Sequence, residues 1–145
     1  MQTQQKHVLL IEDCPGDVFL LEQMLKDTKN HNITITQVPR LVDAFDKLGT
    51  EHFDAIILDL NLPDIDGVAS IAALSAKLPE VPIIVYSGQE NTRLKLNALL
   101  CGAANYLVKG RETGASIEKA IMTSRVASKR EPKAKKAKAE APVGA

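Results

Sequence analysis

Acidic, hydroxyl and amine side chains follow short apolar runs at four places in this sequence. Glu12 and Asp13 come directly after one run, Asp59 ends a second, Ser87 ends a third and Lys109 follows a fourth. If these runs are neighbouring parallel strands, their carboxyl ends lie at one edge of a sheet and the side chains meet there. Three carboxylates placed together repel one another and need a cation to stay charged. Ligation by oxygen atoms alone suits Mg2+.

An aspartate beside a bound cation and a lysine can attack phosphorus and form an aspartyl phosphate. The transferred group also needs cations or donors around its equatorial oxygens, and Lys109 and the Ser87 hydroxyl would supply them. The pattern therefore predicts a Mg2+-dependent phosphoryl acceptor with an aspartate as the nucleophile. Each residue alone has an ordinary explanation, such as a helix cap or a solvated loop lysine, so the prediction depends on the whole set.

Strands and helices that alternate along the chain must position these residues. Helical periodicity with an apolar stripe predicts helices between and after the strands, and this alternation is typical of an α/β fold with a parallel sheet. Isoleucine and threonine alternate in the second strand, which predicts a sheet edge, and Thr113 is a predicted helix cap. The predicted strands are 7–11, 33–38, 55–59, 82–87 and 105–108, and the predicted helices are 17–26, 41–48, 68–78, 91–100 and 116–127.

The length of 145 residues is that of one domain. We expect residues 6–128 to form it and residues 129–145, with six Lys or Arg, two Glu and many Ala, to be a disordered tail. The tail could bind nucleic acid or an anionic membrane through its charge, but no recognition fold accompanies it, so we expect neither. A polar N-terminus and the absence of a long apolar stretch predict a cytoplasmic protein without a membrane span. Cys14 and Cys101 are expected to be free, buried thiols.

Four sequence motifs together resemble the receiver domains of bacterial two-component response regulators. The resemblance implies a flavodoxin-like (βα)5 three-layer sandwich with five parallel strands in the order 2-1-3-4-5. It implies that Asp59 is the phosphoacceptor, that Ser87 and Lys109 hold the phosphoryl group, and that Ser87 and Tyr106 form the switch. The implied Mg2+ ligands are Glu12, Asp13, Asp59 and the backbone carbonyl of Asn61. The motifs are VLLIED (8–13), LDLNLPDIDG (58–67), YSG (86–88) and GAANYLVK (102–109).

The resemblance also implies a function. A sensor histidine kinase or phosphotransfer protein would donate the phosphoryl group, and the domain would catalyse its own phosphorylation and dephosphorylation without being an enzyme in any other sense. The face formed by 91–100, 105–108 and 116–127 would bind a target protein, and a phosphorylation-dependent homodimer is compatible with it. No output domain follows residue 128, so we expect a stand-alone receiver.

Two residues depart from the usual pattern of that family, which has proline after the lysine and more often threonine at the hydroxyl position. Gly110 follows Lys109 here, so a cis peptide is not expected at this point, and Ser87 keeps the hydroxyl. Asp64 and Asp66 are interpreted as solvated loop residues or turn residues. Two alternatives remain open: a small Mg2+-dependent phosphohydrolase with an aspartyl phosphate intermediate, and an interaction module of the same fold that is not phosphorylated.

Overall fold

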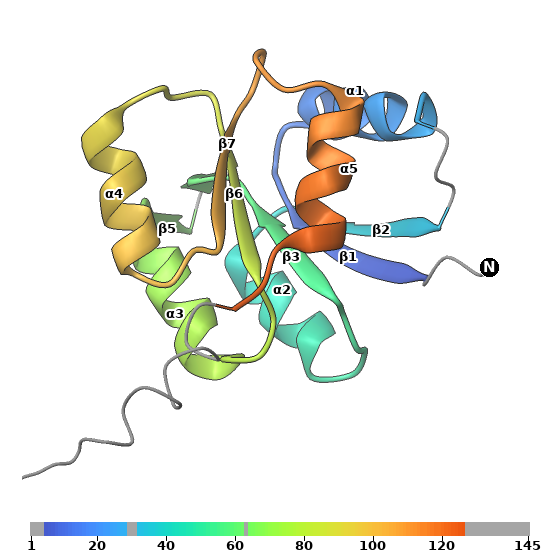
Figure 1. Ribbon diagram of the computed structural model, residues 1–145. Coiled ribbons are helices and arrows are strands. Elements are labelled where there is room, and N and C mark those ends of the chain that lie inside the picture. The colour runs from blue at the N-terminus through green and yellow to red at the C-terminus, as the bar shows by residue number, and fades with distance from the viewer. Residues whose placement is uncertain (1–4, 29–31, 63, 127–145) are drawn as a thin grey trace, which may run out of the picture.

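A parallel sheet forms the centre of the computed structural model, which describes residues 5–28, 32–62 and 64–126 (Figure 1). Its five strands lie in the order β2-β1-β3-β6-β7, which is the predicted 2-1-3-4-5 once two short strands outside the sheet are left out of the count. The alternating segment, β2, lies at the edge of the sheet as predicted. The strands are β1 (Lys6–Ile11), β2 (Ile33–Val38), β3 (Ala55–Leu58), β6 (Ile83–Ser87) and β7 (Asn105–Val108).

Helices cover both faces of the sheet and complete the expected three layers (Figure 1). Successive strand residues point to opposite faces, so Val85 packs in the apolar cluster on the side of α2, α3 and α4, whereas Ile84 and Tyr86 pack in the cluster on the side of α1 and α5. The helices are α1 (Pro15–Lys26), α2 (Leu41–Leu48), α3 (Ala69–Lys77), α4 (Thr92–Leu100) and α5 (Gly114–Thr123). No helix in the described ranges is long and apolar enough to cross a membrane.

The chain after Asp59 differs from the prediction. Strands β4 (Asn61–Leu62) and β5 (Ile65–Asp66) form a small antiparallel pair there, and two-residue strands are too short to show any periodicity in a sequence. The third strand of the sheet ends at Leu58, so Asp59 follows this strand and does not close it.

The last helix begins earlier and ends earlier than the predicted range 116–127. It starts at Gly114 because Thr113 caps it: the side chain of Thr113 accepts from the backbone of Ser116, and the side chain of Ser116 accepts from the backbone of Thr113. The buried stripe stops at Ile121, and Ser124 has an extended backbone. Without an apolar face to pack, further turns gain little stability. The predicted tail, 129–145, lies outside the described residues.

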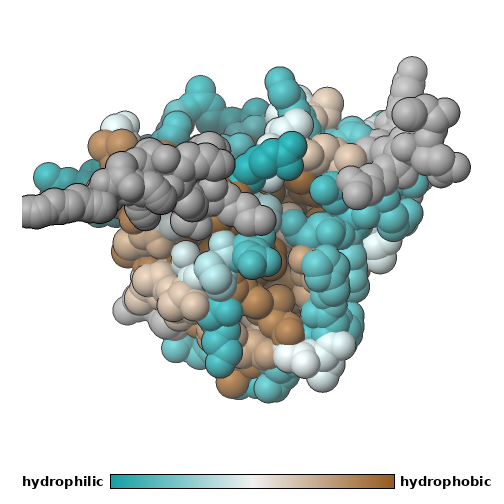
Figure 2. Space-filling model, turned by 60° about the horizontal axis from the view of Figure 1, so that its bottom comes forward, coloured by the Kyte–Doolittle hydropathy of each residue, from teal (hydrophilic) through white to brown (hydrophobic). Residues whose placement is uncertain are grey.

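The two ends of the sheet differ in polarity. The predicted site residues lie at or directly after the carboxyl ends of β1, β3, β6 and β7, and the carboxyl ends of β6 and β7 lie at the top of Figure 1. Figure 2 brings the opposite end forward and shows hydrophobic residues at its centre with hydrophilic residues around them.

Asp64 has a structural role at the start of α2. The residue before this helix, Arg40, provides no side-chain cap. The carboxylate of Asp64 accepts hydrogen bonds from the backbone N–H groups of Leu41 and Val42, both at 3.1 Å. Partial desolvation alone would raise the pKa of Asp64, but these hydrogen bonds outweigh it and lower the pKa below the ordinary value of 3.8. Asp64 is an exposed turn residue, as the sequence predicted, and in addition it caps α2. Asp66 instead lies in the short strand β5.

Asp64→Ala should lower the free energy of unfolding by about 1 kcal/mol at neutral pH, the usual cost of a lost helix cap. Because the folded state depresses this pKa, the contribution is present above the unfolded-state value and is lost as the pH falls through the folded one. Urea unfolding of both proteins at pH 7 and near pH 3 would measure it. A deficit of the same size at both pH values would show that the charge of Asp64 does not contribute.

Candidate functional site

Three carboxylates meet beyond the ends of β1 and β3. Glu12 and Asp13 follow β1, and Asp59 follows β3, which pairs with β1 in the sheet. One carboxylate oxygen from each residue lies within 4.8 Å of the other two. Only 2% of the surface of Glu12 and 6% of that of Asp59 are exposed, while Asp13 is exposed. The structure thus brings together the acidic residues that the sequence pattern selected.

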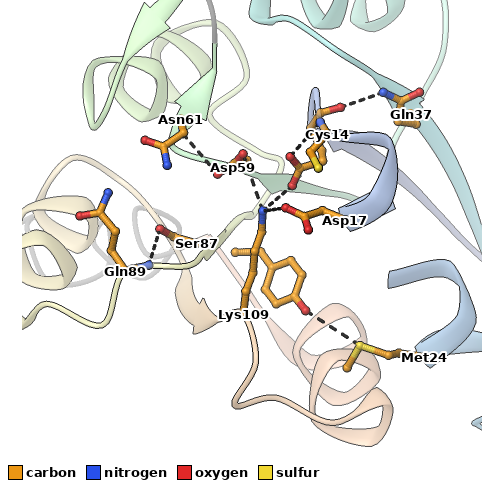
Figure 3. A network of polar contacts seen from close by, with 11 residues as sticks. Cys14, Asp17, Met24, Gln37, Asp59, Asn61, Ser87, Gln89 and Lys109 are labelled. Atoms are coloured by element: carbon orange, nitrogen blue, oxygen red, sulfur yellow. Dashed lines mark hydrogen bonds and ion pairs between the residues drawn. The ribbon is translucent and has the colours of Figure 1, made fainter. Parts of the chain in front are cut away.

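Lys109 extends toward two of these carboxylates, those of Glu12 and Asp59, and toward Asp17, and Figure 3 shows its ammonium group between Asp59 and Asp17. Its Nζ is 2.7 Å from Glu12 Oε1, 2.8 Å from Asp17 Oδ2 and 3.7 Å from Asp59 Oδ2. The lysine side chain is 19% exposed, so these ion pairs are poorly screened by water. Lys109 therefore offsets part of the negative charge in the cluster.

The alternation of β7 determines the direction of Lys109. Leu107 packs in the apolar cluster on the side of α1 and α5, and Lys109, two residues further on, continues on that side. Tyr86 belongs to the same cluster, and the Lys109 Nζ lies 5.8 Å from the centre of its ring. This position brings the ammonium group to Asp17 in the first turn of α1.

Burial and charge shift the pKa values of this group strongly. Burial raises the pKa of Glu12 to about 7; the hydrogen bond from Lys109 opposes the rise and the neighbouring Asp59 adds to it. Burial alone would lower the pKa of Lys109, but its hydrogen bonds to Asp17 and Glu12 outweigh that effect and raise it. Lys109 is therefore a permanent cation, whereas Glu12 exchanges its proton near neutral pH in the protein without metal.

The predicted switch residues lie on the opposite side of the sheet, toward α4. Ser87 is fully buried, and its hydroxyl accepts a hydrogen bond of 3.1 Å from the backbone N–H of Gln89. The Tyr106 side chain is 7% exposed, and its hydroxyl donates to the Gln89 carbonyl at 2.8 Å. The backbone N–H of Lys109 donates to the Ser87 carbonyl at 2.8 Å. Gln89 therefore links the two predicted switch side chains, a role that sequence reasoning missed.

Asn61 and Gly110 border the acidic group. The backbone N–H of Asn61 donates to Asp59 Oδ1 at 3.2 Å, on the side of Asp59 away from Lys109 in Figure 3. Gly110 has a φ of 89°, a value closed to proline, whose ring fixes φ near −65°. Among the described residues no peptide bond is cis. The loop after Lys109 therefore has a backbone conformation at Gly110 that glycine can adopt and proline cannot.

Sequence reasoning also missed Asp17 and placed Cys14 wrongly. In the sequence Asp17 marks only the start of a predicted helix, although an acid in the first turn after Glu12 and Asp13 is a usable signal. Cys14 was expected to be buried, but it is exposed, at the position directly before α1. Its backbone N–H donates to Glu12 Oε2 at 3.2 Å.

The arrangement has the composition of a hard-cation site next to a nucleophile. The three clustered carboxylates offer only oxygen ligands, which Mg2+ and Mn2+ accept. Two of them are buried and one is exposed, so a cation could enter from solvent and relieve the repulsion between Glu12 and Asp59. The residues present therefore fit a divalent metal ion.

Comparisons with known proteins agree with this geometry. A sequence profile described as "Response regulator receiver domain" matches residues 8–122. The swarming motility regulation protein RssB of Serratia marcescens is 31% identical over 71% of this chain and 46% of its own length. The cell cycle transcriptional regulator CtrA of Caulobacter vibrioides is 32% identical over 70% of this chain and 43% of its own length. The match thus spans less than half of each of these two relatives.

A solved structure shows the same fold with a metal ion. It is the receiver domain of sensor histidine kinase PA1611 from Pseudomonas aeruginosa PAO1, described with a magnesium ion coordinated in the active site cleft. It is 26% identical to this chain, with a TM-score of 0.69, and the match covers 81% of this chain and 95% of that one. The expected flavodoxin-like fold is confirmed.

Proposed function

Since this chain belongs to the family of response regulator receiver domains, we propose that it accepts a phosphoryl group on Asp59 and thereby changes its binding to another protein. The observation that carries the proposal is the meeting of Asp59, two further carboxylates and Lys109 at one end of the sheet. These residues come from three separate strand ends. A nucleophile, a cation site and a lysine in contact are what phosphoryl transfer to aspartate requires.

The chemistry is a displacement at phosphorus. An oxygen of the Asp59 carboxylate attacks the phosphorus of a phosphohistidine, a P–O bond forms as the P–N bond breaks, and the leaving imidazole takes up a proton. Lys109 Nζ, 3.7 Å from Asp59 Oδ2, is close enough to contact an oxygen of the transferred group. The Ser87 hydroxyl would contact another after it leaves the Gln89 N–H. The domain itself supplies these groups, so we describe it as catalysing its own phosphorylation.

Glu12, Asp13 and Asp59 would hold Mg2+, with the backbone carbonyl of Asn61 as the further ligand that the family resemblance implies. When bound, Mg2+ offsets the charge of the carboxylates and of the phosphoryl oxygens. Asp59 would then serve both as ligand and as nucleophile, and Lys109 would remain as a cation beside it.

The proposal extends to partners and location. The donor would be a sensor histidine kinase or a phosphotransfer protein, and the receiver would act in the cytoplasm. Tyr106 and Ser87 lie toward α4, and both hydrogen-bond to the backbone of Gln89. A movement of Ser87 would therefore change the position of Tyr106 and with it the surface formed by α4, β7 and α5. Leu96 and Leu100 of α4 are 55% and 84% exposed, and exposed apolar side chains of this size suit a target protein or a second copy.

Intact mass measurement after incubation with acetyl phosphate or phosphoramidate tests the proposal. With Mg2+ the protein should gain one phosphoryl group, about 80 Da. Asp59→Asn and an EDTA-treated sample should gain nothing. Asp46→Asn, on the exposed surface of α2, is the matched control and should gain as much as the wild type. No gain in the wild type would refute the proposal and favour an interaction module, while sustained turnover of small phosphate esters would favour a phosphohydrolase.

Mg2+ affinity should rise with pH. Glu12 must lose its proton to bind a metal ion, and in the metal-free protein its pKa is raised to about 7. Protons therefore compete with Mg2+ below this value, and the affinity should increase about tenfold from pH 6 to pH 8. Isothermal titration calorimetry at both pH values measures the effect. Glu12→Gln should bind more weakly and with little dependence on pH; an equally steep dependence in this variant would assign the proton to another group.

A further inference from the structure

We propose that Asp17 is a positioning residue that holds the Lys109 ammonium group beside Asp59 while phosphoryl transfer takes place. This inference rests on the proposed function and adds a residue to it. Asp17 lies in the first turn of α1, 92 residues from Lys109 in the sequence. Its carboxylate approaches Lys109 from outside the three-carboxylate cluster (Figure 3).

The hydrogen bonds of the ammonium group explain why an anchor is needed. A lysine ammonium has three N–H donors. Two of them are engaged at short range, with Glu12 Oε1 at 2.7 Å and Asp17 Oδ2 at 2.8 Å. Asp59 Oδ2 is more distant, at 3.7 Å. The two short contacts therefore fix the ammonium group and leave its third donor for Asp59 or for a phosphoryl oxygen.

Glu12 is a proposed metal ligand as well as a partner of Lys109, whereas Asp17 is a partner of Lys109 alone. Glu12 belongs to the group of three carboxylates whose oxygens lie within 4.8 Å of one another, and Asp17 does not. A cation bound by that group would offset the negative charge of Glu12. The hydrogen bond from Lys109 to Glu12 would therefore be weaker when the cation is bound. Asp17 is then the remaining short-range partner that keeps Lys109 in place.

The surroundings of Asp17 suit this role. Pro15 stands in the first turn of α1 and the helix buries Leu21 and Leu25, so the helix that carries Asp17 is firmly attached to the sheet. On its other side, Lys109 is bounded by the ring of Tyr86, whose centre lies 5.8 Å from Nζ. A side chain fixed by a rigid helix positions a reacting group better than one on a loop.

The test compares phosphorylation rates of the full chain with acetyl phosphate, each variant at a Mg2+ concentration that saturates it. Asp17→Asn keeps the shape but not the charge and should react about tenfold more slowly. Asp17→Glu restores a carboxylate and should recover most of the rate. Glu22→Gln, which removes one negative charge from the same helix, is the control and should react like the wild type.

A second readout does not depend on phosphorylation. The 15N signal of the Lys109 ammonium group, assigned with Lys109→Arg, should shift and exchange its protons faster in Asp17→Asn, both without metal and with Mg2+. An unchanged signal would refute the contact. An unchanged or higher rate in Asp17→Asn, or a loss that Asp17→Glu does not recover, would refute the positioning role. If the wild type accepts no phosphoryl group, the proposed function fails, and the ammonium signal alone decides whether Asp17 anchors Lys109.

Discussion

Lys109→Met should lower the free energy of unfolding of the metal-free protein by roughly 3 kcal/mol at pH 8, because it leaves buried carboxylates without their cation. The lysine contacts Glu12, which is 2% exposed, and faces Asp59, which is 6% exposed. Methionine fills a similar volume, so the lower free energy of unfolding would come mainly from the missing charge and only to a small extent from changed packing. Urea unfolding in EDTA would measure the difference.

The loss of unfolding free energy in Lys109→Met, called the deficit below, should also depend on pH and on bound Mg2+. Without Lys109 the pKa of Glu12 rises above its value of about 7, and a raised pKa gives stability that is lost as the pH increases. The deficit should therefore be smaller at pH 6 than at pH 8, and Mg2+ should reduce it at pH 8. Lys95→Met, at an exposed position of α4, is the control and should change stability little. An equal deficit in both variants would mean that the acidic cluster does not need Lys109.

Gly114→Ala should destabilise the domain by about 3 kcal/mol, because a β-carbon at this position overlaps the backbone of α1. The added carbon would overlap the carbonyl oxygen of Met24 and would lie 3.2 Å from Thr28 Cγ2. A backbone carbonyl inside a packed helix cannot turn aside, so α1 and α5 would have to separate. The expected result is a lower urea midpoint with an unchanged slope.

A glycine with space around it provides the matched control for this substitution. Gly49 ends α2 with a φ of −78°, and an added β-carbon would lie 3.5 Å from the nearest atom, the Asp46 carbonyl oxygen. Gly49→Ala should leave the free energy of unfolding within about 0.5 kcal/mol of the wild type. If Gly114→Ala were equally mild, the close packing of α1 on α5 would be relaxed in solution.

Much of the fold follows from the sequence because its signals are local. Apolar runs such as 55–59 mark strands buried on both faces, and alternation in 33–38 marks the edge strand. Thr113 marks the start of the last helix, because its side-chain oxygen accepts a hydrogen bond from the backbone N–H of Ser116. The short β4–β5 pair and the early end of α5 escaped prediction, because two-residue strands have no period and a helix end depends on what it packs against.

The sequence by itself also determined the core of the site: residues placed after strands of a parallel sheet must meet at one end of it, which is why Glu12, Asp13, Asp59 and Lys109 can be grouped from their positions in the chain. Only the tertiary structure decided which partners surround them. Asp17 reaches Lys109, and Gln89 joins Ser87 to Tyr106, through contacts that depend on how α1 and the loop after β6 pack on the sheet. Asp64 likewise caps α2 from 22 and 23 residues away. The sequence shows where along the chain each strand ends, whereas side-chain contacts between separate elements arise only when those elements pack in three dimensions.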